Sequence, residues 1–382
     1  MKGRMVVLLV DALGWRLASE SPGFATGLVH RRRLETILGF SSGALPTLFT
    51  GRTPDQHGRW LMYRRANGST PFRGFGALAL LPARLRGSHR LGSWLRREVE
   101  RRGVHGYFHL YEVPRELLER FDLPEREDIF APGSLPMDSL WDTLERRRIS
   151  WRGWNWRTSE SGNLEALAAR AAMGDERLLF CYTADLDALL HRDGSRAGAV
   201  RERMARYDGW LSSLAEKAEA RGERLWLYLL SDHGMVDVGE TRDVMGALQG
   251  LAVRWPADYL AFFDSTMARF WWRSPAAREP VVRALNALGG GRWLTREERA
   301  AQRTPPDFRA WGEDVFLLDP GVLMVPSFMG RGPLAAMHGY DPAHPDMAAL
   351  LWSNRPIPES VRHLTDVRAF LESELEALEA SA

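Results

Sequence analysis

The chain lacks most of the features that mark a secreted, fibrous or membrane-spanning protein. It contains one cysteine in 382 residues, so no disulfide framework holds it together and nothing in it requires an oxidising compartment. No apolar run approaches the roughly 18 residues that cross a bilayer. Hydrophobic residues make up 45% and charged residues 26%, which excludes a disordered chain. The composition therefore predicts a globular protein without a transmembrane segment.

Lysine is also scarce, and positive charge is unevenly spread. Lysine occurs only at Lys2 and Lys217, so 49 of the 51 basic residues are arginine, for which genomic codon bias is the simplest explanation. Residues 1–106 carry a net charge of +12 and the remainder a net charge of −10. The basic part favours an anionic partner. We expect an anionic substrate and no stable nucleic-acid partner.

The first residues resemble the start of a signal peptide, with two basic residues before an apolar run. Asp11 interrupts that run, and no small-residue cleavage site follows it directly. We therefore interpret Val6–Val10 as a first buried strand and expect a cytoplasmic protein.

Apolar strands alternate with amphipathic helices along most of the chain. Leu178–Tyr182 and Leu225–Leu230 are continuous apolar runs, whereas Asn163–Met173 and Val200–Arg221 have helical periodicity. This alternation predicts an α/β fold with a mainly parallel central sheet and helices on both of its faces.

Two stretches, residues 67–135 and 240–325, break the alternation. We interpret both as cap insertions, and residues 1–66, 136–239 and 326–382 as the catalytic α/β core. Insertions after strands at the carboxyl edge emerge near the mouth of a site at that edge, so we expect both insertions there. Within the first insertion, an apolar segment precedes an Arg-rich helix over Phe75–Arg102. That stretch is either a cap helix with a solvated basic face or an element that makes weak contact with a membrane surface.

Acidic residues follow three of the strands. Asp11 follows the first, Asp185 and Asp187 follow Leu178–Tyr182 after two residues, and Asp232 follows Leu225–Leu230 after one. Parallel strands deliver such residues to one edge of the sheet. Carboxylates gathered there repel one another unless a cation lies between them.

Histidines stand beside these acids. Asp187 and His191 are spaced i, i+4, which places them on one face of a helix, and His233 directly follows Asp232. His338 lies in a Gly-flanked loop. Histidine and aspartate together favour Zn²⁺, with Mn²⁺ or Mg²⁺ as alternatives.

Two serines lie between the first strand and the segment TGRTPDQHG. Ser41 and Ser42 precede a predicted helix at Leu45–Phe49, where each is either a helix cap or a nucleophile. A hydroxyl at a helix N-terminus beside a divalent ion has a lowered pKa and is a good nucleophile.

Taken in order, these motifs resemble the alkaline phosphatase superfamily, above all its type I phosphodiesterase/nucleotide pyrophosphatase branch. The resemblance covers residues 11–342 and rests on Asp11, TGRTPDQHG, DLDALLHRDG, SDHGM and MHGYDP. It implies two zinc ions. One is held by Asp187, His191 and His338, and the other by Asp11, Asp232, His233 and the oxygen of the nucleophile.

The resemblance also implies the nucleophile. In the family it lies ten residues before the Gly of the TG pair, here Gly51, which indicates Ser41, and Ser42 is the alternative if the loop is shifted by one residue. The sequence departs from the family at Leu190, where a Gly usually precedes the histidine. It departs again at Met62, where nucleotide pyrophosphatases have an Asn that holds a phosphoryl oxygen. Tyr63, Arg64 and Arg65 are the candidate substitutes for that donor.

These features favour a two-zinc phosphohydrolase that cleaves a phosphodiester, a pyrophosphate or a phosphomonoester through a covalent phosphoseryl intermediate. One alternative is a phosphotransferase that passes the phosphoryl group to a sugar or lipid headgroup. The other is a non-catalytic binding protein on the same fold. The sequence does not determine the natural substrate or the oligomeric state.

Overall fold

The computed structural model describes residues 3–86, 88–220 and 224–380, and the chain divides into two compact units. Unit 1 contains Met1–Thr53, Leu135–Asp237 and Leu334–Ala382, and unit 2 contains Pro54–Ser134 and Val238–Pro333. The catalytic core and cap boundaries drawn from the sequence, at residues 66/67, 135/136, 239/240 and 325/326, remain a prediction. In the described part of the chain, no helix has the length and apolar character needed to cross a membrane.

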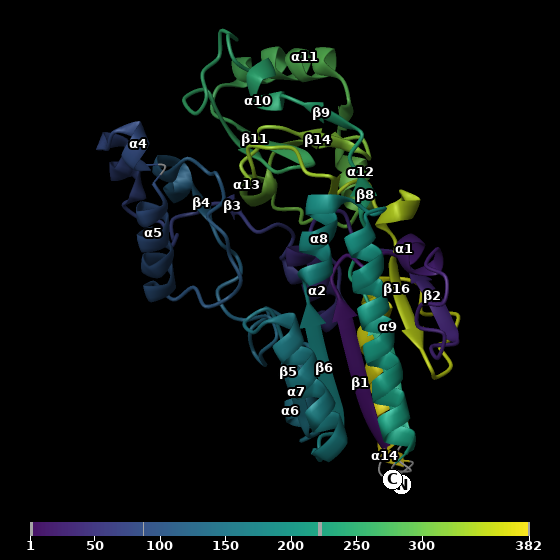
Figure 1. Cartoon of the computed structure of the whole chain (residues 1–382). Coiled ribbons are helices and arrows are strands. Elements are labelled where there is room, and N and C mark those ends of the chain that lie inside the picture. The colour runs from purple at the N-terminus through teal and green to yellow at the C-terminus, as the bar shows by residue number, and fades with distance from the viewer. Residues whose placement is uncertain (1–2, 87, 221–223, 381–382) are drawn as a thin grey trace. The chain divides into compact units, whose positions relative to one another are not determined.

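Unit 1 is built on a six-stranded sheet. In spatial order its strands are β2 (His30–Leu34), β16 (Ala349–Ser353), β7 (Arg224–Leu230), β1 (Gly3–Val10), β6 (Leu178–Thr183) and β5 (Trp151–Trp154). Strand β1 pairs in parallel with β6 and β7, and β5 with β6, whereas β16 runs antiparallel to β7 and β2. Figure 1 shows β1 and β6 side by side in the same direction, with α9 along them. The predicted mainly parallel α/β fold is confirmed.

Helices cover both faces of this sheet. The helices of unit 1 are α1 (Trp15–Ser19), α2 (Ser41–Thr50), α6 (Leu140–Arg146), α7 (Glu160–Met173), α8 (Asp185–Asp193), α9 (Gly198–Glu219), α14 (Leu364–Ala380) and the 3₁₀ helix η4 (Pro345–Met347). Leu8 of β1 packs in one buried cluster with residues of α7, α8 and α9. On the other face, the ring of Phe180 contacts Phe49 of α2, and the ring of Tyr228 contacts Phe370 of α14. The predicted end of helix α9, Arg221, lies outside the described residues.

A short antiparallel pair completes unit 1, formed by β8 (Val236–Asp237) and β15 (Ala336–Met337). The pair is formed by residues just after β7 and just before His338. It therefore brings the C-terminal Gly-flanked loop beside the end of β7.

Unit 2 combines a four-stranded antiparallel sheet with short helices. The sheet has the order β10 (Tyr259–Phe263), β11 (Met267–Trp272), β13 (Asp314–Leu318) and β12 (Gly291–Trp293). Two further strand pairs are β3 (Arg64–Arg65) with β4 (Phe121–Asp122), and β9 (Glu240–Arg242) with β14 (Val322–Met324). Its helices are α3 (Pro54–His57), α4 (Ala83–Arg86), α5 (His89–Arg101), α10 (Val244–Ala247), α11 (Arg278–Leu288), α12 (Arg296–Ala301), α13 (Phe308–Trp311) and the 3₁₀ helices η1 (Phe75–Leu80), η2 (Arg115–Arg120) and η3 (Pro275–Ala277).

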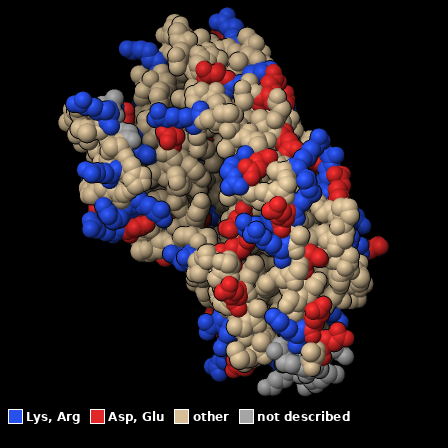
Figure 2. Space-filling view, in the orientation of Figure 1, with Lys and Arg blue, Asp and Glu red and all other residues tan. Residues whose placement is uncertain are grey.

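The two chain segments of unit 2 share one hydrophobic core. The ring of Phe121, from the first segment, lies 5.0 Å from that of Phe262 and 6.2 Å from that of Trp271, both from the second. The surface of this unit is rich in arginine, and Figure 2 shows blue side chains gathered over α4 and α5. The aromatic contacts between the two segments show that they pack together as one unit.

Candidate active site

Two groups of metal-ligand residues form at the carboxyl ends of the strands in unit 1. Asp11 follows β1, Asp187 lies in the first turn of α8 after β6, and Asp232 follows β7. Within each group, the nitrogen and oxygen atoms that could hold an ion lie within 4.8 Å of one another. The groups are Asp187, His191 and His338, and Asp11, Asp232 and His233.

The first group is held by helix α8. Its turn places His191 Nε2 3.2 Å from Asp187 Oδ1, and His338 Nε2 lies 3.6 Å from the same oxygen. The Nδ1 atom of His191 lies 2.9 Å from the backbone oxygen of Ala336. A hydrogen bond donated from Nδ1 to that carbonyl leaves Nε2 free to coordinate an ion, as is usual for metal-binding histidines.

The second group is held by the end of β7. His233 Nε2 lies 3.3 Å from Asp11 Oδ1 and 3.4 Å from Asp232 Oδ2. Its Nδ1 atom lies 3.0 Å from the backbone oxygen of Gly234 and can donate to it, which again leaves Nε2 for the carboxylates. The rings of His233 and His338 stack with their centroids 3.9 Å apart, so the two groups adjoin.

Two glycines allow the loops that carry these residues to approach each other. A Cβ atom on Gly234 would lie 2.0 Å from the backbone oxygen of Asp346, and a Cβ atom on Gly14 would lie 2.7 Å from the Cα of Gly234. No other residue fits at either position without moving backbone. The glycine in SDHGM is therefore a packing requirement of the site.

The electrostatics of the two groups favour a bound cation. Asp11, Asp232, His233 and His338 are all buried. Burial, and next the charge of Asp232, raises the pKa of Asp11 well above its usual value, while burial followed by the neighbouring histidines lowers the pKa of His338.

Three polar atoms of the groups, Asp187 Oδ1, Asp232 Oδ2 and His338 Nδ1, are buried without a hydrogen-bond partner among the described residues. Buried carboxylates with unused oxygens beside histidines are costly unless an ion compensates them. The mixed nitrogen and oxygen donors therefore fit divalent ions such as Zn²⁺.

Ser41 is the first residue of α2, and the helix thus begins four residues earlier than predicted. Its Oγ lies 3.0 Å from His233 Nε2 and 3.4 Å from each carboxylate oxygen of Asp11. Phe40, not a serine, occupies the N-cap position. Since the N-terminus of a helix carries partial positive charge, an anion formed at Ser41 Oγ is stabilised there.

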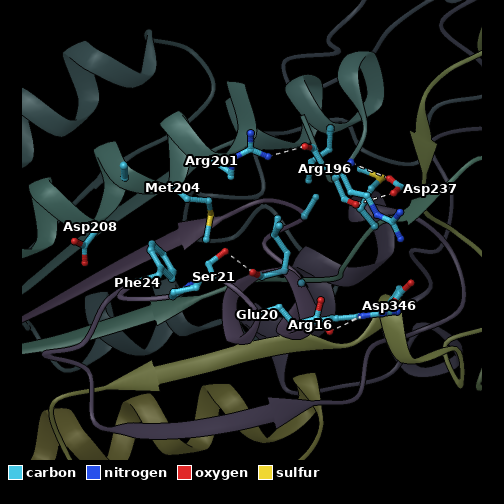
Figure 3. Close-up of a pocket in the computed structure, with 18 of the residues that line it drawn as sticks. Arg16, Glu20, Ser21, Phe24, Arg196, Arg201, Met204, Asp208, Asp237 and Asp346 are labelled. Carbon is cyan, nitrogen blue, oxygen red and sulfur yellow. Dashed lines mark hydrogen bonds and ion pairs between the residues drawn. The ribbon is translucent and has the colours of Figure 1, made fainter. Parts of the chain in front are cut away.

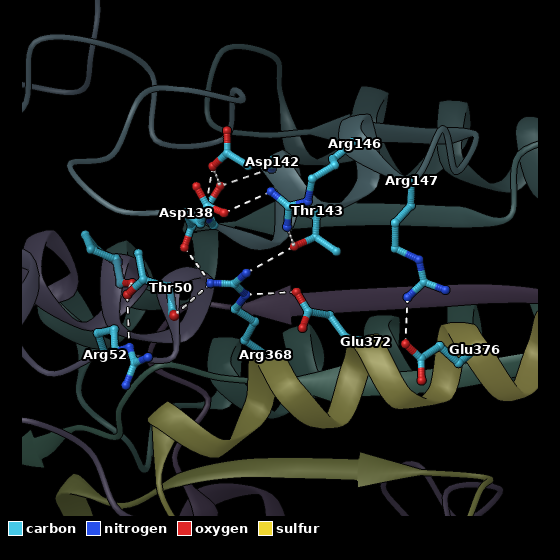
Figure 4. Close-up of polar contacts among 12 residues, drawn as sticks. Thr50, Arg52, Asp138, Asp142, Thr143, Arg146, Arg147, Arg368, Glu372 and Glu376 are labelled. Atoms are coloured by element: carbon cyan, nitrogen blue, oxygen red, sulfur yellow. Dashed lines mark hydrogen bonds and ion pairs between the residues drawn. The ribbon is translucent and has the colours of Figure 1, made fainter.

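The opposite end of α2 is anchored by Arg368 of α14. Its guanidinium donates to the backbone oxygen of Thr50 (3.0 Å) and to Thr143 Oγ1 (3.0 Å), and pairs with Glu372 (2.9 Å). Figure 4 shows these contacts converging on the guanidinium of Arg368. Gly51 ends α2 in the left-handed conformation, with φ of 66°.

The sequence interpretation missed Tyr182, whose hydroxyl donates a hydrogen bond to Asp11 Oδ2. Tyr182 lies in the apolar run of β6, which the sequence indicates only as a buried strand. The alternation of side chains along a strand was the available signal, because it places Tyr182 on the same face of β6 as Phe180. Phe40 was also missed, and its ring packs edge-on against His338 with centroids 5.2 Å apart.

Tyr63, Arg64 and Arg65 lie in unit 2, and two of them have partners there. The Tyr63 hydroxyl donates to the backbone oxygen of His109 (2.8 Å), and Arg64 donates twice to one oxygen of Asp122 (3.0 and 2.8 Å). No side-chain hydrogen bond or ion pair of Arg65 is resolved among the described residues.

Unit 1 also contains a cavity of about 480 Å³. Its walls include Phe24 and Met204, and Arg16 pairs with Glu20 and Asp346 at its edge (Figure 3). Within the described chain, its lining contains neither Ser41 nor any residue of the two groups. This cavity is therefore distinct from the space that the ligand atoms and the serine face.

Comparisons with known proteins agree on the family and the fold. The family model for type I phosphodiesterase/nucleotide pyrophosphatase matches residues 5–287. The structure of human ectonucleotide pyrophosphatase/phosphodiesterase 5 has a TM-score of 0.66 at 14% identity, covering 98% of this chain and 95% of that one.

Two murine structures of the same enzyme are equally similar. One has a TM-score of 0.66 at 15% identity, and an inactive form in complex with AMP has 0.65 at 16%, each covering 98% of this chain and 95% of that one. No curated protein matches the sequence. At these identities the structures show an alkaline phosphatase-like fold, as predicted. By its match over most of its length, the chain belongs to the type I phosphodiesterase/nucleotide pyrophosphatase family.

Proposed function

We propose that this protein is a two-metal phosphohydrolase that cleaves a phosphodiester, a pyrophosphate or a phosphomonoester through a phosphoseryl intermediate. The observation that carries this proposal is the Ser41 hydroxyl at the start of α2, within 3.4 Å of His233 and Asp11 in the second ligand group. In this arrangement the serine would attack the phosphorus atom. The helix N-terminus and the ions held by the two ligand groups would stabilise the negative charge that develops around it.

Asp187, His191 and His338 would hold one Zn²⁺, and Asp11, Asp232 and His233 the other. When bound, such ions neutralise charge on phosphoryl oxygens and lower the pKa of a neighbouring hydroxyl. Mn²⁺ and Mg²⁺ are the alternatives, although histidine ligands favour zinc.

Ser41 performs the covalent step. Its deprotonated Oγ forms a bond to phosphorus while the bond from phosphorus to the leaving oxygen breaks, and that oxygen departs with the electron pair and takes up a proton. Water then cleaves the phosphoseryl ester and restores the serine. Tyr182 holds Asp11 in place during both steps by its hydrogen bond.

For the phosphoryl oxygen that Met62 cannot bind, we propose Arg65 as the donor. Tyr63 and Arg64 already donate to His109 and Asp122, so Arg65 is the member of the trio with a guanidinium to offer. Alanine substitutions at the three positions, assayed on one small ester, test this choice. We expect Arg65→Ala to lose about 30-fold or more in kcat/KM, and a loss within threefold would exclude Arg65.

The main experiment measures bound metal and hydrolysis together. The purified full chain should contain zinc and hydrolyse bis(p-nitrophenyl) phosphate or p-nitrophenyl phosphate, and chelation should abolish both activities. Ser41→Ala should lose roughly a thousandfold or more in kcat with most of the metal retained, while Ser42→Ala, the matched control, stays active.

The outcomes separate the alternatives. An inactive Ser42→Ala beside an active Ser41→Ala would move the nucleophile by one residue. Phosphoryl transfer to added glycerol or a sugar that exceeds hydrolysis would indicate a phosphotransferase. Full metal content with no turnover of either ester would favour a binding protein and contradict the proposal.

A further inference from the structure

Exposed apolar side chains concentrate in one short segment of unit 2. Of the seven large hydrophobic side chains exposed in the described chain, four lie between residues 80 and 107. They are Leu80 (89% exposed), Leu85 (48%), Trp94 (45%) and Tyr107 (45%). Scattered exposed apolar residues are ordinary, but such a concentration marks an interaction surface.

The exposed side chains of helix α5 form a regular pattern within this surface. Arg90, Trp94, Arg97 and Arg101 follow the spacing i, i+4, i+7, i+11 and are all exposed, so one face of the helix presents three arginines around one tryptophan. Leu95, in contrast, faces inward and is fully buried in the core of unit 2.

Positive charge surrounds these apolar groups. Residues 73–107 contain eight arginines and two glutamates. Glu98 and Glu100 each pair with an arginine of the same segment, Arg102 and Arg96. Of the eight arginines in this segment, Arg86, Arg96, Arg101 and Arg102 pair with carboxylates. No ion pair among the described residues is resolved for the other four, Arg73, Arg84, Arg90 and Arg97.

A shallow cup of about 750 Å³ adjoins this face, and its lining includes Arg73, Arg102 and Arg126 but no acidic residue. The guanidinium carbon of Arg102 lies 5.0 Å from the ring centroid of Phe75, and that ring lies 6.5 Å from Trp94. One aromatic ring thus separates the cup from the helix face. Arg102 and Arg126 pair with Glu98 and Asp122, so Arg73 is the guanidinium of the cup that is available to a phosphate group.

We propose that this surface, formed by η1, α4, α5 and the cup and here named the basic face, docks unit 2 onto an anionic lipid membrane. A tryptophan and leucines insert at the boundary of headgroups and acyl chains, and the surrounding arginines bind lipid phosphates. Nucleic acid would use the charge but not the exposed aliphatic side chains of Leu80 and Leu85. The apolar and cationic groups together therefore favour a lipid surface.

Co-sedimentation of the full chain with vesicles tests the proposal. We expect binding to phosphatidylcholine vesicles that contain about 30% phosphatidylserine, little binding to phosphatidylcholine alone, and a decrease with rising salt. Arg90→Glu with Arg97→Glu should weaken partitioning by at least about 25-fold, since each basic residue near an anionic surface contributes about fivefold. Leu80→Asp with Trp94→Asp should also abolish binding.

Matched controls come from unit 1. Met173 is 83% exposed, so Met173→Asp adds the same charge at an exposed apolar position outside the basic face. Arg206, an exposed residue of α9, gives the control Arg206→Glu. Both controls should bind vesicles as the parent does, and circular dichroism should show that every variant is folded.

Three results would overturn the proposal. The first is a parent protein that does not bind anionic vesicles. The second is an equal loss of binding in the control variants and the basic-face variants. The third is retention on heparin without vesicle binding, which would assign the face to a soluble polyanion. None of these readouts depends on hydrolysis, so the proposed activity is tested separately.

Discussion

At the scale of single residues, Tyr182 shows how a group outside the ligand sets supports the site. Its hydroxyl is buried in the interior of unit 1 and donates to Asp11, whose own pKa is raised by burial and by Asp232. A hydrogen bond to the carboxylate opposes that rise, because it favours the charged form. The tyrosine thus helps keep Asp11 an effective ligand.

We predict that Tyr182→Phe weakens metal affinity about 10- to 100-fold, because loss of an outer-shell partner leaves a ligand poorly oriented. Competition with a chelator measures this change. The control is Tyr228→Phe, which also removes a hydroxyl bonded to a carboxylate, that of Glu374, and neither residue belongs to a ligand group. Equal metal affinity in the two variants would show that Tyr182 is only structural.

We expect the buried His57 to make the stability of unit 2 depend on pH. It is buried, and burial followed by the nearby charge of Arg59 lowers its pKa from 6.5 to about 3. Between these two values the unfolded chain binds a proton that the folded chain does not, so the free energy of unfolding decreases as pH falls from 6.5 toward 3.

We predict that His57→Asn reduces this slope. Asn offers an oxygen to the backbone N–H of Arg59, which donates to His57 Nδ1 at 3.1 Å, but it does not titrate. Denaturant unfolding at pH 7, above the window that the two pKa values define, and at pH 4.5, inside that window, gives the comparison. Identical slopes in parent and variant would contradict the assignment.

At the scale of elements, helix α2 matters because its first residue is Ser41. Arg368 of α14 fixes its last turn through the carbonyl of Thr50, and also contacts Thr143, which follows α6's first turn. Most of this side chain is shielded from solvent. Arg147 also joins α14, but through Glu376 (Figure 4) and Glu379, and both of these pairs are more exposed.

We predict that Arg368→Ala lowers the free energy of unfolding by about 2 kcal/mol, because shielded carbonyl groups lose a charged donor. Arg147→Ala should cost less than about 1 kcal/mol, since exposed ion pairs contribute little. Chemical denaturation of both variants decides between these values. A larger loss of free energy for Arg147→Ala than for Arg368→Ala would show that the contacts of Arg368 with α2 contribute less to stability than the exposed ion pairs of Arg147.

At the scale of the whole molecule, each unit is assembled from segments far apart in the sequence. Unit 2 joins Pro54–Ser134 to Val238–Pro333 through a core in which Phe121 and Phe262 touch. Because residues of both segments pack in one buried cluster, the two should gain and lose structure together.

We predict that Phe262→Ala destabilises unit 2 by about 3–5 kcal/mol, as expected for a cavity in a packed core. Hydrogen exchange followed by mass spectrometry should become faster in both segments of unit 2. Phe370→Ala, a buried aromatic of unit 1, is the control and should leave unit 2 unchanged. Faster exchange in residues 238–333 alone would show that the two segments fold independently.

Local patterns in the sequence were enough to identify the parallel strands β1, β6 and β7 and the acids that follow them, whereas the antiparallel strands β2 and β16 were not predicted. Buried parallel strands read as continuous apolar runs, and the acids that follow them meet at one edge because the strands run in parallel. The spacing of Asp187 and His191 is a property of one helical turn, so it needs no tertiary information. The fold class followed from the alternation of strands and helices, and the family was predicted from the resemblance of the ordered motifs.

Tertiary structure alone decided which groups share an environment. The stacking of His233 on His338 joins residues about a hundred positions apart, and the contact of Gly14 with Gly234 depends on two loops that the sheet brings together. Hydrogen-bond partners can also lie far apart in the sequence. Within unit 2, Tyr63 bonds to His109 and Arg64 to Asp122. Sequence patterns report the propensities of neighbours along the chain, whereas these contacts depend on packing between distant segments.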